Sequence, residues 1–168
     1  MTRRRGFSLT EVVVVLVIIL IASSVALSAY TGFSKYSALE SSARQISRTL
    51  LFAKQGAITR RNDMVVYFDI DRQTYWVDEE DASLGTTFRK VVEPKKLEVG
   101  VKIQDVQVGA LTQSNGTITA RFAPSGENPL VEVTMRREMD SALDPKNFYT
   151  VQLYPASDEA RILERERR

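Results

Sequence analysis

The 168-residue chain contains no cysteine and no histidine. Without cysteine it can form neither a disulfide bond nor a thiolate metal site. Without histidine it lacks the commonest general base and the commonest metal ligand. Much hydrolase chemistry is therefore excluded, and we expect neither enzymatic activity nor a bound metal or other cofactor. The length fits one globular domain.

The chain also lacks a large net charge, because 23 Lys+Arg face 21 Asp+Glu, a formal net charge of +2. A protein dedicated to binding DNA usually has a strongly basic surface. Basic residues occur at Arg60-Arg61, at Arg136-Arg137 and in the tail from Arg161 to Arg168, but glutamates interrupt the tail and cancel most of its charge. DNA binding is therefore the weaker alternative.

Charge is missing altogether from one long segment near the N-terminus. From Val12 to Ser34, 23 successive residues carry no charge. As a helix this run would extend about 34 Å, enough to cross a bilayer core of about 30 Å. Arg3, Arg4 and Arg5 precede it. A basic flank before an apolar run predicts a cytoplasmic N-terminus, with the later residues across the membrane.

Three interpretations of this region compete. The small residues in Ala26-Leu27-Ser28 resemble a signal-peptidase site, which would make the protein secreted. The run is longer than the roughly 7–15 apolar residues of an ordinary signal peptide, which argues against such a site. A plain membrane anchor is the second interpretation. The third interpretation accounts for Glu11, a carboxylate at the edge of the apolar run. An ionisable side chain is costly there and normally has a partner.

The segment Arg5-Gly6-Phe7-Ser8-Leu9-Thr10-Glu11, followed by the apolar run, resembles the class III signal of type IV pilins and type II secretion pseudopilins. The resemblance implies that a prepilin peptidase cuts between Gly6 and Phe7, and that Phe7 becomes an N-methylated N-terminus. It also implies that Glu11 is the family's glutamate, which sets the register against neighbouring subunits. Removal of residues 1–6 would leave 20 Lys+Arg against 21 Asp+Glu.

The chemistry of Glu11 supports this interpretation. Glu11 lies four residues after Phe7, so both belong to the first turn of a helix that begins there. A carboxylate near a helix N-terminus is favoured by the helix dipole. The amine that cleavage creates at Phe7, on the same chain or a neighbour, would pair with Glu11 in a medium of low dielectric constant. Cleavage is thus predicted to create the amine that pairs with Glu11 and offsets the cost of placing its charge at the edge of the apolar run.

Downstream of the uncharged run, apolar residues recur at steps of three and four, which predicts an amphipathic helix with its stripe facing a protein core. No proline precedes Pro94 to interrupt it. We expect a helix from about Ser8 to Thr59, with Asn62 as its left-handed cap. The stripe comprises Phe33, Tyr36, Leu39, Ala43, Ile46, Leu50, Ala53 and Ala57.

From Met64 the pattern changes to short β-rich runs separated by turn signals. Asp69 and Asp71 are expected in a hairpin turn rather than a calcium loop, because the glycine and distal glutamate of such a loop are missing. The acidic run from Asp78 to Asp81 is expected to form a solvated loop, with cation binding as the alternative. The expected strands are 64–70, 74–77, 87–92, 97–104, 117–122, 130–136 and 148–154.

This region resembles the GspH/FimT group of minor pilin-like proteins. The resemblance rests on the helix end from Ala43 to Arg60, the strands around 65–68 and Tyr75-Trp76, and the turn Phe122-Ala123-Pro124-Ser125-Gly126. It implies a pilin-like α+β fold, in which a long N-terminal helix packs on a C-terminal antiparallel β domain. Residues 154–158 replace the glycine-centred closing hairpin that is common in the group.

These features divide the chain into five expected segments. They are a prepilin leader at 1–6, a transmembrane helix at 7–34, its amphipathic continuation at 35–62, a β-sheet domain at 63–157, and a charged helical or disordered tail at 158–168.

The resemblance implies a minor pseudopilin of a type II secretion system. It would cross the bacterial inner membrane once, with a cytoplasmic N-terminus and a periplasmic C-terminal domain. The expected partners are prepilin peptidase, other major and minor pseudopilins or pilins, and inner-membrane lipid. The alternative is a FimT-like minor type IV pilin that works in pilus assembly or DNA uptake.

Overall fold

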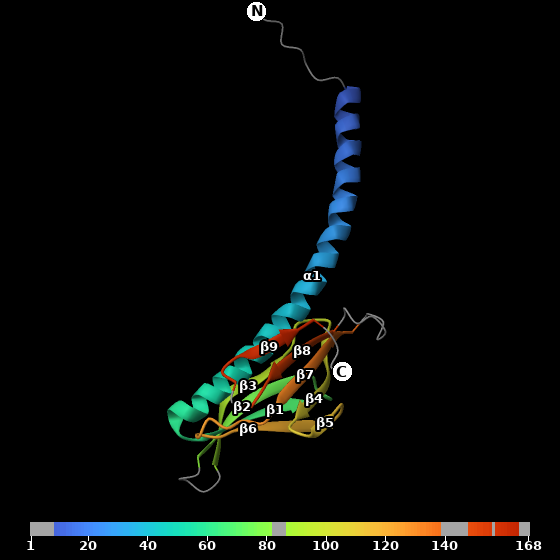
Figure 1. The fold of residues 1–168 in the computed structure, drawn as a ribbon. Helices are drawn as coiled ribbons and strands as arrows, with labels where there is room; N and C mark the ends of the chain where they lie inside the picture. Colours follow the sequence, from blue (N-terminus) through green and yellow to red (C-terminus); the bar gives the residue numbers. More distant parts are fainter. Residues whose placement is uncertain (1–8, 82–86, 139–147, 156, 165–168) are drawn as a thin grey trace, which may run out of the picture. The chain divides into compact units, whose positions relative to one another are not determined.

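The computed structural model describes residues 9–81, 87–138, 148–155 and 157–164. It divides into two units, Met1–Ser37 and Ala38–Arg168. The elements within the described residues are α1 (Leu9–Arg60), β1 (Asp63–Asp69), β2 (Thr74–Asp81), β3 (Thr87–Lys96), β4 (Val101–Val108), β5 (Leu111–Gln113), β6 (Thr117–Phe122), β7 (Val131–Arg137), β8 (Phe148–Leu153) and β9 (Ala160–Leu163) (Figure 1).

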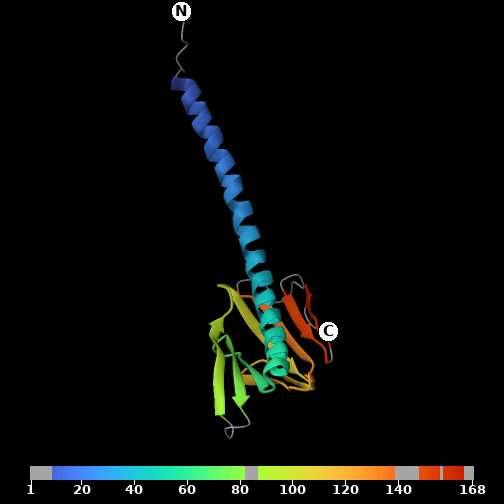
Figure 2. The ribbon, with the colours of Figure 1, turned by 90° about the vertical axis from the view of Figure 1, so that its left-hand side faces the viewer.

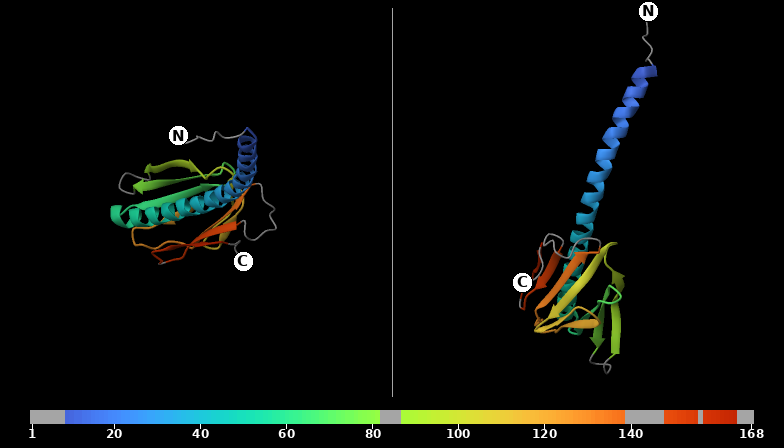
Figure 3. Two further views of the ribbon diagram at one scale, coloured as in Figure 1. Left: turned by 90° about the horizontal axis from the view of Figure 1, so that it is seen from above. Right: turned by 90° about the vertical axis from the view of Figure 1, so that its right-hand side faces the viewer.

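The strands of the second unit form two antiparallel sheets. One sheet has the strand order β3-β2-β1-β6, and the other has the order β5-β4-β7-β8-β9. In Figure 2 the end of α1 lies between the green β2 and β3 on one side and the red β8 and β9 on the other. Figure 3 shows the same arrangement from two more directions. The predicted α+β class, a helix packed on an antiparallel β domain, is confirmed.

The predicted helical stripe forms one wall of the core. Its described members are fully buried and lie in one cluster with apolar residues from both sheets. The structure describes the backbone of Phe33 and Tyr36 but not their side chains. At Gly56, an added Cβ would come within 2.9 Å of Met64 Cε, so glycine allows the first strand to approach the helix closely. The buried stripe residues are Leu39, Ala43, Ile46, Leu50, Ala53 and Ala57.

The helix cap and the start of one strand differ from the prediction. The helix ends at Arg60, and the left-handed residue is Arg61, with a φ of 57°, rather than Asn62. Instead, the Asn62 side chain donates a hydrogen bond to Glu79. The strand expected at 97–104 begins only at Val101, because residues 97–100 form a turn.

The C-terminal tail was expected to be helical or disordered, and that expectation is wrong for its first part. Residues Ala160–Leu163 form β9, which pairs with β8 from Thr150 to Leu153. The short β5 is a second strand that the sequence pattern did not predict. Both lie at edges of the second sheet, where the pairing partner creates the strand.

The acidic run is not a loop. Asp78, Glu79 and Glu80 belong to β2, and their cross-strand neighbours on β3 are Lys90, Arg89 and Phe88. Opposite charges facing each other across a strand pair stabilise it. The acidic residues therefore extend the hairpin beyond the expected strand end.

Candidate functional site

The N-terminal site that the sequence predicts lies at the start of α1. Gly6 and Phe7, the predicted cleavage site and methylated N-terminus, lie outside the described residues. α1 begins at Leu9, and Glu11 is in its first turn. A carboxylate there lies in the positive end of the helix dipole. The part of Glu11 in setting register stays a prediction.

The residues after Glu11 present a long apolar surface. The side chains from Val12 to Ile21 are between 47% and 69% exposed. Apolar patches of this extent mark a surface that binds something outside the chain.

Within the part of the chain that the structure describes, no helix is both long and apolar enough to cross a membrane.

In the second unit, Glu79 is the centre of a buried ionic cluster. Its side chain accepts hydrogen bonds from Arg60, Asn62 and Arg89. Burial acts to raise the pKa of Glu79, but these hydrogen bonds outweigh it and hold the pKa below its ordinary value. The cluster joins the C-terminal end of α1 to β2 and β3. Sequence analysis missed it, because the partners lie far apart along the chain.

Arg121 on β6 forms a second ionic cluster. Its Nη1 lies 2.7 Å from Asp63 Oδ2 on β1 and also contacts Glu80 on β2. The hydrogen bond to Asp63 is the largest cause of a raised pKa for Arg121. The cluster spans three adjacent strands, and it engages a basic side chain that could otherwise bind an anionic partner.

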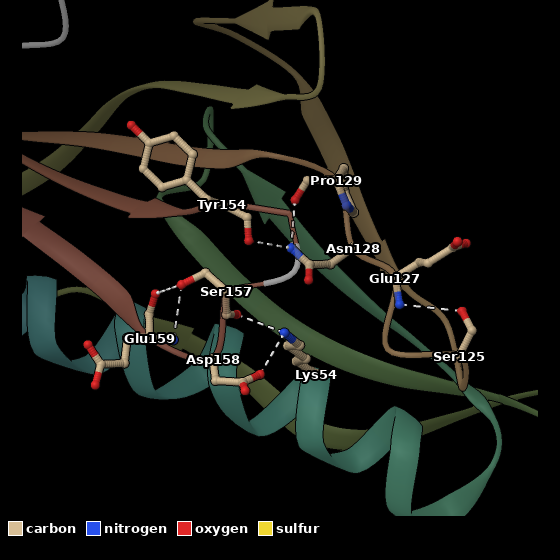
Figure 4. Close-up of polar contacts among 9 residues, drawn as sticks. All are labelled: Lys54, Ser125, Glu127, Asn128, Pro129, Tyr154, Ser157, Asp158 and Glu159. Atoms are coloured by element: carbon tan, nitrogen blue, oxygen red, sulfur yellow. Dashed lines mark hydrogen bonds and ion pairs between the residues drawn. The ribbon is translucent and has the colours of Figure 1, made fainter.

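Lys54 is a buried cation on the core side of α1. Its Nζ donates hydrogen bonds to the Ser157 carbonyl at 2.7 Å and to Asp158 Oδ1 at 3.0 Å (Figure 4). Lysine is rarely buried unless paired. These two bonds hold the β8–β9 loop against the helix. The sequence offered one signal, since Lys54 follows Ala53 on the predicted buried stripe.

Asn128 joins the same loop to the β6–β7 connection. Its Nδ2 donates to the carbonyls of Tyr154, at 3.1 Å, and Pro129, at 3.0 Å (Figure 4). Both donor hydrogens are thereby used, which fixes the orientation of the amide. Beside it is an open pocket of about 520 Å³, lined by Ser125, Gly126, Glu127, Asn128 and Pro155. The predicted turn around Gly126 thus forms one rim of this pocket.

The acidic residues of the first hairpin form the predicted turn. Asp69 Oδ1 accepts a hydrogen bond from the backbone N–H of Arg72 at 2.8 Å, and Asp71 Oδ2 accepts one from Gly116 N at 3.1 Å. Among the residues that the structure describes, no group of three or more potential ligands is placed to hold a metal ion.

Comparison with known proteins found two kinds of similarity to this chain. Residues 1–27 match the prokaryotic N-terminal methylation motif. Two solved structures of the minor pseudopilin EpsH, from the type II secretion system of Vibrio cholerae, are similar to this chain. One is 16% identical over 77% of this chain and 98% of EpsH; the other is 17% identical over 80% and 99%. Both superpose with a TM-score of 0.59.

The chain has a pilin-like fold. The type IV pilin signal and this fold confirm the resemblance to pilin-like proteins that the sequence indicated. No curated protein sequence is significantly similar to the chain.

Proposed function

We propose that the chain is a minor pseudopilin that assembles with other pilin-like subunits and catalyses no reaction. One combination carries the proposal: a methylation motif at residues 1–27 precedes a domain with the fold of EpsH. In this proposal a prepilin peptidase cuts between Gly6 and Phe7. The uncharged run then holds the subunit in the inner membrane, with its N-terminus on the cytoplasmic side and its β domain in the periplasm.

The exposed apolar surface from Val12 to Ile21 supports a subunit that is first held in the membrane and later incorporated into a filament. Lipid covers an apolar helix in the membrane, and neighbouring helices cover it in a filament, so both states remove it from water. Glu11 then decides the register. Inside a helical bundle its carboxylate needs a cation, and the Phe7 amine of a neighbouring subunit supplies one.

DNA capture by a FimT-like pilin is the competing function. It requires basic side chains that are available to phosphates. Arg60 and Arg89 contact Glu79, and Arg121 contacts Asp63 and Glu80. These ion pairs engage three basic side chains within the domain, which disfavours DNA binding through them. A gel-shift assay of the purified chain with duplex DNA at physiological salt should show no retardation, whereas retardation at low protein concentration would favour the alternative.

Processing provides the direct test of the proposal. Co-expression with a prepilin peptidase should remove residues 1–6, and intact-mass measurement should find an N-methylated Phe7 at the new N-terminus. Gly6→Leu should abolish the cut, because the bulky side chain replaces the residue before the cleaved bond. A mature N-terminus near Ala29 would instead identify an ordinary signal peptide.

Glu11 tests the assembly step. Glu11→Gln should leave cleavage and membrane content unchanged, because a neutral amide is less costly in lipid than a carboxylate. Cross-linking to partner subunits should fall, since the pair with the Phe7 amine is lost. Glu11→Asp keeps the charge and should retain more cross-linking than Glu11→Gln. Normal cross-linking of the Gln variant would remove Glu11 from the mechanism.

A further inference from the structure

The side chain of Asn128 carries a hydrogen-bond acceptor that the fold does not use. Asn128 is 8% exposed. Its Nδ2 donates to the carbonyls of Tyr154 and Pro129, so turning the amide over would place its oxygen against two other oxygens. Its Oδ1 accepts no hydrogen bond within the part of the chain that the structure describes. Buried polar atoms nearly always have a partner, so this exception requires an explanation.

Figure 4 shows the direction in which this oxygen points. It faces away from the carbonyls of Tyr154 and Pro129, into the space between the β6–β7 connection and the β8–β9 loop. The open pocket of about 520 Å³ is lined by residues of the same two segments. Ligand sites commonly have volumes of about 300–1,000 Å³. We refer to this pocket, lined by Ser125, Gly126, Glu127, Asn128 and Pro155, as the Asn128 pocket.

The turn that forms one rim of the Asn128 pocket is ordered before any ligand binds. The backbone N–H of Gly126 donates to the Ala123 carbonyl at 3.0 Å, and that of Ala123 donates to the Glu127 carbonyl at 3.2 Å. Gly126 has a φ of 85°, and Ile58 of α1 lies 3.6 Å from the place of an added Cβ. A ligand therefore does not have to order this rim. All of these residues belong to the second unit.

The charges around the Asn128 pocket favour a cationic ligand. Glu127 is the one charged residue among the five described residues that line it, and its exposed carboxylate forms no ion pair with them or with other described residues. On the neighbouring loop, Asp158 is paired with Lys54, and Glu159 is exposed. With Arg161 included, these three carboxylates still outnumber the two cations.

A guanidinium group matches both acceptors of the Asn128 pocket. It carries five N–H donors in a planar fork, so it can serve two acceptors at once. One donor would bond to Asn128 Oδ1, while another pairs with the Glu127 carboxylate at the rim. Because Asn128 Oδ1 is shielded from water, a charge-assisted bond to it is stronger than the same bond on an open surface.

We propose that the Asn128 pocket binds an arginine side chain of a neighbouring pilin-like subunit. This inference rests on the proposed function, because it names a contact through which the subunit joins its partners. Asn128 then has two roles. Its Nδ2 ties together the two segments that form the walls, and its Oδ1 accepts the donor that enters between them.

The amide of Asn128 provides a direct readout of binding. The chain contains four asparagines, so selective ¹⁵N labelling of their side chains gives a simple spectrum. The full chain in detergent micelles is titrated with N-acetylarginine methylamide. The Nδ2 hydrogens of Asn128 should shift and the shift should saturate, because a bond accepted at Oδ1 polarises the amide. The Nδ2 signal of Asn62, which donates to Glu79, should stay unchanged and serves as the reference.

Two further probes test the selection for a cation. N-acetylcitrulline methylamide has the same shape without the charge and should bind several-fold more weakly. N-acetylglutamate methylamide should cause no shift. An Asn128 signal that does not respond to the arginine probe would mean that water satisfies Oδ1, and this result would overturn the proposal. Equal binding of the arginine and citrulline probes would also overturn it.

Glu127 tests the rim of the pocket. Glu127→Gln should weaken binding of the arginine probe by up to about fivefold, the effect of an exposed ion pair. Glu127→Lys places a competing cation at the rim and should reduce both probe binding and cross-linking to partner subunits further. Glu93→Lys is the matched control, because Glu93 is an exposed carboxylate on β3 that lies outside the pocket. Both Lys variants should keep the thermal transition of the wild type, and Glu93→Lys should keep its binding.

The outcomes separate this inference from the proposed function. A chain that prepilin peptidase does not cut between Gly6 and Phe7 contradicts the proposed function, whatever the pocket binds. Normal cleavage together with normal cross-linking of Glu127→Lys overturns the role of the Asn128 pocket alone. Normal cleavage with cross-linking that falls for Glu127→Lys but not for Glu93→Lys is the result that we expect.

Discussion

The two units of this chain differ in how far their apolar side chains are buried. In Ala38–Arg168, the helical stripe is fully buried by two sheets, and the buried charges of Lys54 and Glu79 have protein partners. In Met1–Ser37, about half of the surface of the side chains from Val12 to Ile21 is exposed. The second unit therefore buries most of its apolar side chains within itself, whereas the first leaves a run of apolar side chains exposed.

Separating the units should have the largest effect. A fragment of residues 35–168 should lose membrane association entirely, because the uncharged run is removed. It should remain monomeric and unfold in one cooperative thermal transition, since its core comes from residues 39 onward. Flotation and differential scanning calorimetry would measure both properties. Aggregation of the fragment, or the absence of a transition, would show that the division between the units is wrong.

A pair of equivalent substitutions sharpens the comparison. Leu50→Ala removes a fully buried side chain and should destabilise the domain by about 2–5 kcal/mol. Leu16→Ala removes a side chain that is 53% exposed in the other unit. It should leave the thermal transition of the β domain unchanged and weaken only membrane retention. Similar losses of stability in both variants, measured by thermal unfolding in detergent, would contradict the independence of the units.

The buried carboxylate of Glu79 should give the second unit its own pH dependence. Its folded-state pKa lies below the unfolded value of about 4.3, so its stabilising effect is complete above that pH and is lost as the pH falls through the folded pKa. Glu79→Gln should therefore lower stability at pH 7, by about 1–3 kcal/mol, and reduce the loss on acidification.

Glu40→Gln is the control for this measurement, because Glu40 forms an exposed pair with Arg44 within one helical turn. Exposed pairs of this kind contribute little. Thermal unfolding between pH 3 and pH 7 should therefore follow the wild type for Glu40→Gln and differ for Glu79→Gln. The same pH profile for all three proteins would remove Glu79 as the source of acid sensitivity.

Periodic parts of the fold could be predicted from the sequence. The helix was expected from about Ser8 to Thr59 and runs from Leu9 to Arg60, because its signal repeats over many turns. The first hairpin was also predicted, since Asp69 accepts a hydrogen bond from the backbone N–H of Arg72 within its turn. In each case the residues that determine the structure are close together in the chain.

The prediction errors occur where residues that are distant in the sequence determine the structure of a segment. Ala160–Leu163 has no strand pattern of its own and is a strand because β8 offers it a free edge. The acidic residue Glu79 looked like part of a solvated loop, but Arg60 and Arg89 neutralise it inside the fold. Tertiary contacts override local propensity at such sites.

Some residues of the candidate site could also be predicted from the sequence, and others could not. Gly6, Phe7 and Glu11 could be named because the signal is a short linear motif, and residues 1–27 match the methylation motif. The pocket beside Asn128 could not, because nothing in the sequence indicates that Pro155 lies next to the turn around Gly126. Only the folded chain brings these two segments together.

The bond between Lys54 and the β8–β9 loop has a consequence for how the protein is made. The partners of this lysine, Ser157 and Asp158, are 103 and 104 residues further along the chain. The ribosome finishes the helix long before these acceptors exist, so Lys54 gains them only when nearly the whole polypeptide has been made. A chain that stops before Ser157 cannot form these two bonds, and its helix lacks this link to the end of the second sheet.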